Sequence, residues 1–266
     1  MKVGYVQFEP VFGEKERNLK NILKWLDKGA IYDSDLLVLP ELCNTGYIFR
    51  TKREVARLSE DVPEGQTTKA LASFAEERGT YIVAGLCERE GERCYNSAVL
   101  VGPEGFINVY RKAHLFDREK LFFSKGNTEF AVYDASKTKI GMMICFDWFF
   151  PEVTRTLALK GAQVICHPAN LILPYCQTAL LGTAVQNKVF IITANRIGIE
   201  RGIEFTGESQ IIDPNMRILV KSGRNSEEAN TVEIDPKLAD NKWVTKRNNI
   251  WTDRRTDLFH FLLNKA

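Results

Sequence analysis

The feature that most constrains the fold is a repeated alternation between short, continuous apolar runs and longer stretches with apolar residues at helical spacing. The runs at 35–40 and 141–145 lack the polar alternation of a half-exposed strand, so each predicts a strand buried on both faces. The stretch at 14–30 has leucine and isoleucine three or four positions apart, which predicts a helix that covers such a sheet. Because the pattern recurs in both halves of the chain, we expect an α/β fold with two sheets covered by outer helices.

The size of the chain favours one domain. With 266 residues and 44% hydrophobic content it can bury a large core, and α/β proteins of this size are often undivided. The tail at about 237–266 departs from the alternation, since it mixes both charges with aromatic residues that look exposed. We therefore expect one domain over residues 1–266, with this tail packed either on its own domain or on a partner subunit.

The charge balance argues against polyanionic partners. With 36 basic and 34 acidic side chains the net charge is +2, which supplies no strong field for nucleic acid or an anionic membrane surface. No apolar stretch approaches the roughly 18 residues of a membrane span, and Met1 leads into an expected strand rather than a signal peptide. We expect a cytoplasmic protein with no nucleic-acid or membrane partner.

The six cysteines give no sign of a disulfide framework or a metal site. They include no C-x-x-C pair, and in a cytoplasmic chain of this size free thiols are the expected state. Cys166 and His167 are adjacent, so on a strand their side chains point to opposite faces, and no second pair has the spacing of metal ligands. We expect no bound metal.

Three chemically useful side chains stand at the ends of expected strands. Glu41 and Lys112 each come at the end of an apolar strand. Cys145 ends the run at 141–145, before a turn and a helix that begins near Pro151. Because ligands of open α/β sheets gather outside the carboxyl ends of the strands, these side chains could share one cleft.

A thiol, a carboxylate and an ammonium group together suit nucleophilic hydrolysis. A thiol needs a base or a cationic neighbour before it attacks, and Glu41 could accept the proton of Cys145. Lys112 and the backbone N–H of Phe146 could then hold a developing oxyanion, and such donors typically contribute ~3 kcal/mol each. The three residues therefore indicate a candidate catalytic site.

The residues alone leave other interpretations open. Glu41 and Lys112 could form an ordinary ion pair, and Cys145 could be an inert core residue, since free cysteine is among the most buried residue types. A cysteine and histidine pair is a rival mechanism, for which His114 is the best placed of the three histidines.

Three segments resemble, in order and spacing, the signature segments of the nitrilase superfamily of carbon-nitrogen hydrolases. They are LPELCNTGY (39–47), YRKAHLF followed by REKLFFSKG (110–126), and GMMICFDWFFPE (141–152). The resemblance extends from Met1 through the NRIG segment at 195–198. It implies a four-layer α-β-β-α sandwich in a single domain, and association of subunits into a homodimer or a higher homo-oligomer.

The resemblance also implies roles for the residues of these segments. Glu41 would be the general base and acid, Lys112 would stabilise the oxyanion or thioimidate, and Cys145 would become acylated. The family's second glutamate, which follows the lysine, would fall on Glu119 and would orient Lys112 or the attacking water. The residues expected to bind substrate are Tyr47, Phe146, Trp148 and Asn170.

Two segments depart from the family pattern. Gln186, Asn187 and Lys188 stand where the family usually places a glutamate beside an asparagine and then an arginine, and these positions are expected to support the structure. Trp148 and Phe149 stand where members that act on acids with a free carboxylate often have an arginine. We therefore expect neutral substrates.

Residues and resemblance together predict an amidase that cleaves a non-peptide C–N bond of a small molecule and releases ammonia through a thioester, with no metal or organic cofactor. Hydrolysis of aliphatic nitriles is the nearest alternative, because the same triad can attack a nitrile carbon, and N-carbamoyl amide hydrolysis comes next. A ligand-binding scaffold would have no need of Glu41, Lys112 and Cys145 together. A thiol redox sensor would need a resolving cysteine, whose spacing is missing.

Overall fold

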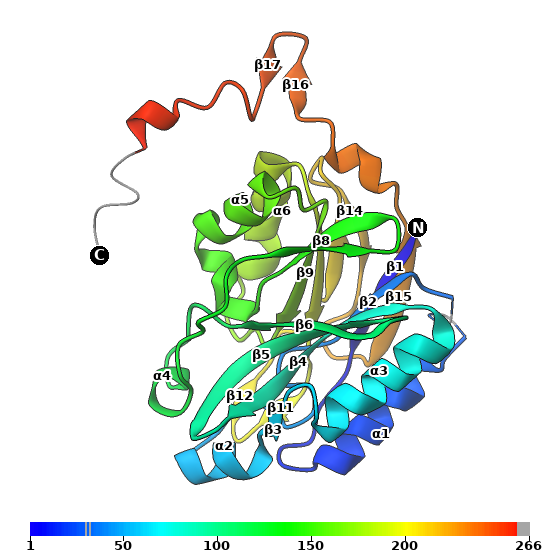
Figure 1. Cartoon of the computed structure of the whole chain (residues 1–266), viewed down its shortest axis with the longest axis vertical. Helices are drawn as coiled ribbons and strands as arrows, with labels where there is room; N and C mark the ends of the chain where they lie inside the picture. Colours follow the sequence, from blue (N-terminus) through cyan, green and yellow to red (C-terminus); the bar gives the residue numbers. More distant parts are fainter. Residues whose placement is uncertain (30, 32, 260–266) are drawn as a thin grey trace.

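In the computed structural model, which describes residues 1–29, 31 and 33–259, two β-sheets lie face to face and helices cover their outer faces (Figure 1). A single cluster of buried apolar side chains joins the sheets, with Val3 and Val83 from one and Cys166 and Ile192 from the other. The expected α-β-β-α sandwich in a single domain is confirmed.

The first sheet has seven strands within the described residues, in the order β15, β1, β2, β4, β5, β6, with β3 beside β4. The strands β1, β2 and β4 run parallel, so the segment that follows β2 emerges at their shared carboxyl edge. The bounds are β1 Lys2–Gln7, β2 Leu36–Val38, β3 Glu60–Asp61, β4 Tyr81–Glu90, β5 Arg93–Gly102, β6 Gly105–Arg111 and β15 Glu228–Glu233.

The second sheet has six strands within the described residues, in the order β14, β13, β10, β9, β8, β7, and β8, β9 and β10 run parallel. Two small hairpins, β11–β12 and β16–β17, stand apart from both sheets. The bounds are β7 Val132–Ala135, β8 Thr138–Met142, β9 Val164–Ala169, β10 Phe190–Asn195, β11 Ile199–Glu200, β12 Ile203–Glu204, β13 Gln210–Ile212, β14 Ile218–Lys221, β16 Trp243–Thr245 and β17 Asn248–Asn249.

The helices bury one face each against the sheets. α1 packs Ile22, Trp25 and Leu26, spaced as the sequence pattern predicts for one helix face, into the apolar cluster at the first sheet, and Leu19 is buried one turn earlier. α5 begins at Pro151, whose fixed φ suits a first helical turn, and buries Leu157 on the second sheet. The bounds are α1 Lys15–Leu26, α2 Lys52–Leu58, α3 Gln66–Arg78, α4 Glu119–Phe122, α5 Pro151–Leu159, α6 Cys176–Asn187, and the 3₁₀ helices η1 Cys145–Phe149, η2 Pro236–Ala239 and η3 Thr256–Leu258.

One local expectation is wrong. The run at 141–145 was expected to be strand throughout, but β8 ends at Met142 and Cys145 opens η1 instead. The Ile144 N–H donates to the Asp147 carboxylate (2.9 Å) rather than to a neighbouring strand. The side chain of Asp147 therefore ends the strand locally, which hydropathy alone does not register.

The tail leaves the sandwich after η2 (Figure 1). Lys242 Nζ donates to the Lys188 carbonyl (3.0 Å), and the Trp251 ring lies 5.1 Å from the guanidinium of Arg155 on α5. The hairpin residues Trp243 and Val244 are exposed. Residues 260–266 of the tail lie outside the described residues, and packing of the whole tail on the domain or on a partner stays a prediction.

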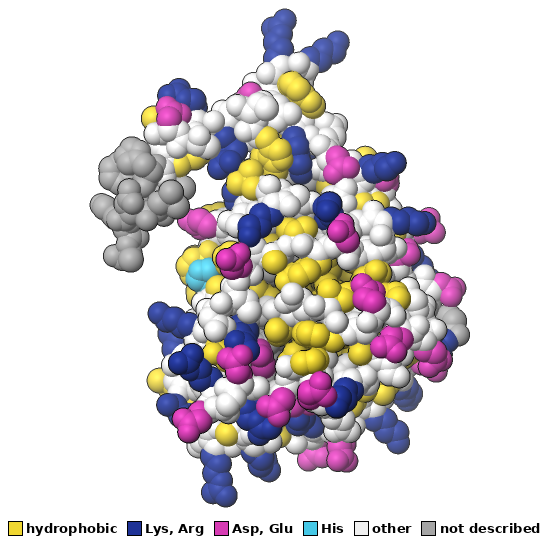
Figure 2. All heavy atoms as spheres, viewed as in Figure 1, with side chains coloured by type: hydrophobic (Ala, Val, Ile, Leu, Met, Phe, Trp, Pro, Cys, Tyr) yellow, Lys and Arg dark blue, Asp and Glu magenta, His cyan; other side chains and the backbone are white. Residues whose placement is uncertain are grey.

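The surface reflects the small net charge. On the face shown in Figure 2, basic and acidic side chains are interspersed over the described residues. Within residues 1–259, leaving aside 30 and 32, no helix combines the length and hydropathy required to span a bilayer.

Candidate active site

Glu41 is held against strand β4 by a close approach of two backbones. The Gly85 N–H donates to the Pro40 carbonyl (3.1 Å), and the Cys43 N–H donates to the Gly85 carbonyl (2.9 Å). A Cβ at residue 85 would lie 2.4 Å from the Cα of Glu41, so this approach requires glycine. The Glu41 side chain is thereby fixed in the interior and is fully buried.

Lys112, directly after β6, places its ammonium between two carboxylates. Nζ donates to Glu41 Oε1 (2.6 Å) and to Glu119 Oε1 (2.8 Å), and all three side chains are buried. Burial acts to lower the pKa of Lys112, but the Glu119 and Glu41 carboxylates outweigh it and raise the pKa, so the ammonium persists. An ammonium has three N–H donors, and the described residues engage two of them, which leaves one for a further acceptor.

Glu41 has one engaged oxygen and one unpartnered oxygen. Oε1 accepts from Lys112 and from Asn96 Nδ2 (2.7 Å), whereas Oε2 is buried with no hydrogen-bond partner among the residues that the structure describes. Burial, opposed by Lys112 and reinforced by Glu119, raises the pKa of Glu41. A carboxylate with a raised pKa and an available oxygen is suited to accept a proton near neutral pH.

Cys145 has a strained backbone, with φ at +40°. For a residue with a side chain, such a conformation costs roughly 1–3 kcal/mol and persists only where the surroundings enforce it. Its Sγ lies 3.8 Å from the Asn170 carbonyl, and Asn170 Nδ2 donates to the Glu41 carbonyl (2.9 Å). Burial and then the charge of Glu41 raise the pKa of Cys145, so the resting side chain is a thiol.

The carbonyl of Cys145 is held by a buried histidine. His167 Nε2 lies 3.0 Å from this oxygen, and Nδ1 lies 3.1 Å from Thr193 Oγ1. A carbonyl only accepts, so Nε2 is the donor and Nδ1 accepts from the hydroxyl. Burial lowers the pKa of His167 to about 4, so the imidazole is neutral at pH 7.

Asp147 ties the turn at Cys145 to the end of strand β6. Its Oδ2 accepts from the Ile144 N–H (2.9 Å) and the Tyr110 hydroxyl (2.8 Å), and its Oδ1 accepts from the His114 N–H (3.0 Å). The His114 ring contacts the same Oδ1 through Nδ1 (2.8 Å) and stacks on Phe150 at 3.6 Å. These contacts direct the ring of His114, the alternative base, toward Asp147 and Phe150.

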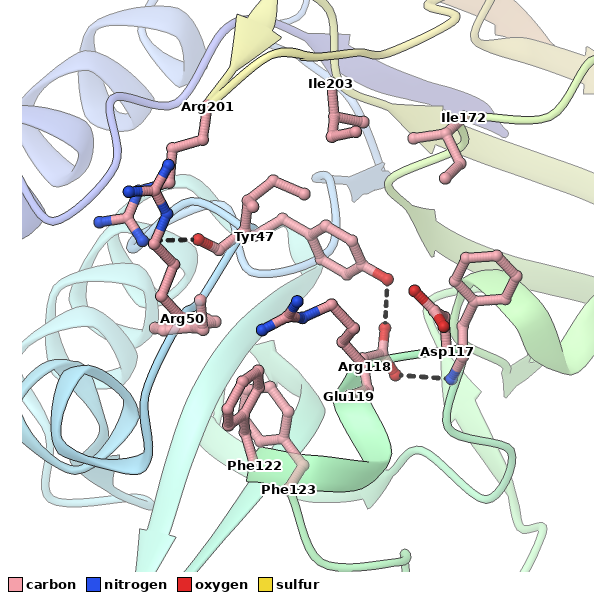
Figure 3. A pocket seen from close by; sticks show the side chains of 13 residues that line it. Tyr47, Arg50, Asp117, Arg118, Glu119, Phe122, Phe123, Ile172, Arg201 and Ile203 are labelled. Carbon is pink, nitrogen blue, oxygen red and sulfur yellow. Dashed lines mark hydrogen bonds between the residues drawn. The ribbon is translucent and has the colours of Figure 1, made fainter.

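Tyr47 and Glu119 line a cavity of about 430 Å³ (Figure 3), and Glu119 also contacts Lys112. The Tyr47 hydroxyl donates to Glu119 Oε1 (2.6 Å), and the Phe116 N–H donates to Glu119 Oε2 (3.1 Å). Burial and then the Glu119 charge hold the pKa of Tyr47 well above its usual range, so the hydroxyl keeps its proton. Arg118 also lines this cavity, as does Arg201, which pairs with Glu54 outside the site (2.8 Å).

A second cavity, of about 290 Å³, contains Cys145. It shares Phe116 and Ile172 with the first cavity, so the two adjoin. Its other lining residues are mostly apolar: Phe146, Trp148, Phe149, Asn170, Leu171, Leu173 and Tyr175. Cys145 therefore faces an apolar space, whereas Glu119 lines the other cavity.

The structure brings the residues expected from the sequence into one place. Lys112 joins Glu41 to Glu119, Tyr47 joins Glu119, and Asn170 lies against Cys145 and Glu41, while Phe146 and Trp148 line the cavity. Sequence reasoning does not find Asn96, Asp147 or His167. Asp147 alone carries a signal, as a carboxylate within an otherwise apolar run.

The residues that depart from the family pattern near 182–190 lie at the end of α6. Arg155 Nη2 donates to the Gln186 carbonyl (2.9 Å), and Lys188 Nζ donates to Asn215 Oδ1 (3.0 Å). Asn187 bonds within its own helix. Across the part of the chain that the structure describes, no group of three or more His, Cys, Asp or Glu side chains is arranged to hold a metal ion.

Comparisons with known proteins show the family to which the chain is similar. The carbon-nitrogen hydrolase family model matches residues 2–241. A Pyrococcus abyssi protein named nitrilase is 48% identical over 259 residues, which is 97% of this chain and 99% of that one. An (R)-stereoselective amidase of a Pseudomonas species is 34% identical, with 88% and 85% of the two chains covered. The structure of a carbon-nitrogen hydrolase from Helicobacter pylori G27 matches with a TM-score of 0.87 at 26% identity, over 100% and 98% of the chains.

Proposed function

We propose, because the chain belongs to the carbon-nitrogen hydrolase family, that it is an amidase that releases ammonia from a small-molecule amide through a thioester on Cys145. The observation that carries the proposal is the buried ammonium of Lys112, which contacts two carboxylates, Glu41 at 2.6 Å and Glu119 at 2.8 Å. A structural ion pair needs one carboxylate. A second buried carboxylate near a thiol adds a desolvation cost, and such clusters are typical of active sites.

In the first half-reaction the Cys145 sulfur attacks the amide carbonyl carbon while Glu41 Oε2 takes the thiol proton. The C–S bond forms as the carbonyl π bond breaks, and the resulting oxyanion accepts the remaining N–H of Lys112. Glu41 then gives its proton to the amide nitrogen. The C–N bond breaks as the C=O bond reforms, ammonia is released, and the acyl group remains on Cys145 as a thioester.

In the second half-reaction water replaces the amine. Glu41 takes a proton from the water while the water oxygen attacks the thioester carbon, and Lys112 again binds the oxyanion. The C–S bond breaks, the proton on Glu41 returns to sulfur, and the carboxylic acid leaves. Glu119 acts in both halves by orienting Lys112, which it contacts at 2.8 Å.

The substrates are expected to be neutral amides with an apolar acyl group. The cavity that contains Cys145 is lined by Trp148 and Phe149, neither of which can pair with a carboxylate. Burying an unpaired charge costs several kcal/mol. We expect a preference of about tenfold to a hundredfold in kcat/KM over substrates with a free carboxylate, which corresponds to ~1.4–2.7 kcal/mol.

A matched pair tests this preference: the monoamide of a dicarboxylic acid and its methyl ester. Faster turnover of the ester supports the expectation, and faster turnover of the free acid contradicts it. The variant Arg118→Gln is the control, because Arg118 is one of three arginines, with Arg50 and Arg201, that line the adjoining cavity. If the free acid is turned over faster in the wild type and that advantage is lost in Arg118→Gln, this arginine pairs with the carboxylate.

Nitrile hydrolysis is a second candidate, favoured by the relative named nitrilase at 48% identity. The same sulfur would add to the nitrile carbon to give a thioimidate, whose nitrogen takes the proton from Glu41. Water would then displace ammonia, so both reactions converge on the thioester. An N-carbamoyl amide would follow the amide route.

Ammonia release separates these candidates. The purified protein is incubated with matched aliphatic amides, nitriles and N-carbamoyl amines, with Cys145→Ala as the blank. The proposal expects amides to give the largest kcat/KM and the blank to give none. Greater turnover of nitriles would replace it with the second candidate, and release by the blank would refute both.

We further propose that the protein works as a homo-oligomer. Supporting this, Phe149 and Tyr175 line the Cys145 cavity yet are 57% and 58% exposed, and apolar side chains at such positions favour contact with another subunit. Light scattering should give at least twice the chain mass of 30.3 kDa, and a monomer at micromolar concentration would contradict the proposal.

A further inference from the structure

A buried ion pair lies outside the reaction described above. Arg196 follows β10 and is 1% exposed, Glu200 on β11 is 5% exposed, and Nη1 contacts Oε2 at 2.6 Å. The guanidinium also lies 4.1 Å over the Phe205 ring and donates through Nη2 to the Pro10 carbonyl (3.3 Å). Two buried charges are costly to desolvate, so the position of the pair calls for an explanation.

The pair is joined to the site through the backbone at Tyr47. Glu200 Oε1 accepts from the Tyr47 N–H (2.8 Å) and from the Ile48 N–H. Gly46 has φ at +82°, and a Cβ there would lie 2.6 Å from Glu200 Oε2. The segment after Glu41 is therefore built to bring its backbone onto this carboxylate.

From Tyr47 the contacts continue to the ammonium. The Tyr47 hydroxyl donates to Glu119 Oε1 (2.6 Å), which is the same oxygen that receives Lys112 Nζ (2.8 Å), as Figure 3 shows for the first of these bonds. The Tyr47 ring also packs edge-on against the Phe205 ring, with centroids 6.0 Å apart. Arg196 is therefore linked to Tyr47 by two sets of contacts, one through Glu200 and one through Phe205.

The direction of one N–H of Lys112 depends on this chain of contacts. An ammonium rotates freely about its C–N bond until hydrogen bonds fix it, and Glu41 and Glu119 use two of its three donors. The third then points in a single direction. If Glu119 shifts, that donor no longer meets the developing oxyanion, and small errors in such geometry reduce rates strongly.

We propose that Arg196 and Glu200 are positioning residues that fix Tyr47 and Glu119 and thereby aim the free N–H of Lys112 at the oxyanion. The inference rests on the proposed amide hydrolysis. Because the donor acts on charge that develops in the transition state, disturbing the pair lowers kcat and leaves KM nearly unchanged.

The test compares Glu200→Gln with a matched control. The control is Asp213→Asn, which breaks another ion pair at i,i+4 spacing with a buried carboxylate, Asp213 with Arg217 (2.6 Å), outside the site. Glu200→Gln is expected to lower kcat about tenfold to a hundredfold with KM within about threefold. Asp213→Asn should lower the melting temperature and leave kcat unchanged.

A double-mutant cycle separates positioning from general damage. Tyr47→Phe removes the hydroxyl that holds Glu119. Adding Glu200→Gln to Tyr47→Phe should therefore lower kcat by less than about threefold further. If the two losses multiply, Glu200 does not act through Tyr47 and the inference is wrong. If Glu200→Gln does not fold, Arg196→Lys replaces it in the cycle, because lysine keeps a cation against Glu200. Its loss of kcat should likewise not multiply with that of Tyr47→Phe.

The outcomes distinguish the two proposals. If the wild type turns over an amide and kcat is unchanged in Glu200→Gln and Arg196→Lys, the positioning role is wrong and the proposed function stands. Absence of wild-type turnover on every amide and nitrile overturns the proposed function and the positioning role with it.

Discussion

The buried imidazole of His167 makes a measurable prediction about stability against pH. Its pKa is lowered to about 4 by burial, whereas an unfolded histidine titrates near 6.5. As the pH falls below 6.5 the unfolded chain binds a proton at this residue and the folded chain does not, so the folded state loses stability. The loss ends near pH 4, below which both states are protonated.

The magnitude follows from the two pKa values. A difference of about 2.5 pKa units, at about 1.4 kcal/mol per unit, lowers the free energy of unfolding by about 3 kcal/mol between pH 7 and pH 4. Typical domains have a total free energy of unfolding of about 5–15 kcal/mol, so a loss of this size is a large fraction of the total.

Urea unfolding at half-unit steps from pH 4 to pH 7.5 measures this loss. The comparison is with His167→Gln, whose amide can still donate to the Cys145 carbonyl but does not titrate. Other acidic groups cancel in the difference between the proteins, so the wild type should lose about 3 kcal/mol relative to the variant. A constant difference across the range, or an imidazole NMR titration of His167 centred near pH 6.5, would refute the reasoning.

Three further predictions concern the reaction. Glu41→Gln should lower kcat by about 100-fold to 10,000-fold and His114→Asn by far less, and the opposite ranking in ammonia release would favour a histidine base. Asn96→Leu should lower kcat about tenfold, because it removes a donor (2.7 Å) from the oxygen of Glu41 that Lys112 also binds; unchanged turnover would show that Lys112 suffices. Since the pKa of Cys145 is raised, its alkylation by iodoacetamide should be slow at pH 7 and accelerate at alkaline pH, and a rapid, pH-independent rate would contradict a resting thiol.

The parts of the site that the sequence predicts are those with a local signal. Glu41, Lys112 and Cys145 each come at or near a strand end, within a segment that resembles a family signature. Asn96 lies inside β5 and pairs with Cys87 of β4 across the sheet. An asparagine on a strand carries no local mark, and its contact with Glu41 exists only after the strands are paired.

The backbone at Cys145 and the ion pair at Arg196 were beyond prediction for different reasons. A run of apolar residues up to Cys145 predicts strand, and only the Asp147 carboxylate, which bonds the Ile144 N–H (2.9 Å), ends it earlier. Arg196 and Glu200 are charged residues that each lie two positions from a glycine, which is typical of an exposed loop. Their burial depends on Phe205 and Pro10, distant in the chain.

The most direct test of the central claim is the mass of the Cys145 peptide after reaction with a neutral aliphatic amide. The reaction is stopped with acid within milliseconds and the protein is digested at low pH, which preserves a thioester. The account predicts that the peptide with Cys145 gains the mass of the acyl group, and that Cys145→Ala gains none and releases no ammonia. An adduct confined to another cysteine, together with full turnover by Cys145→Ala, would contradict it.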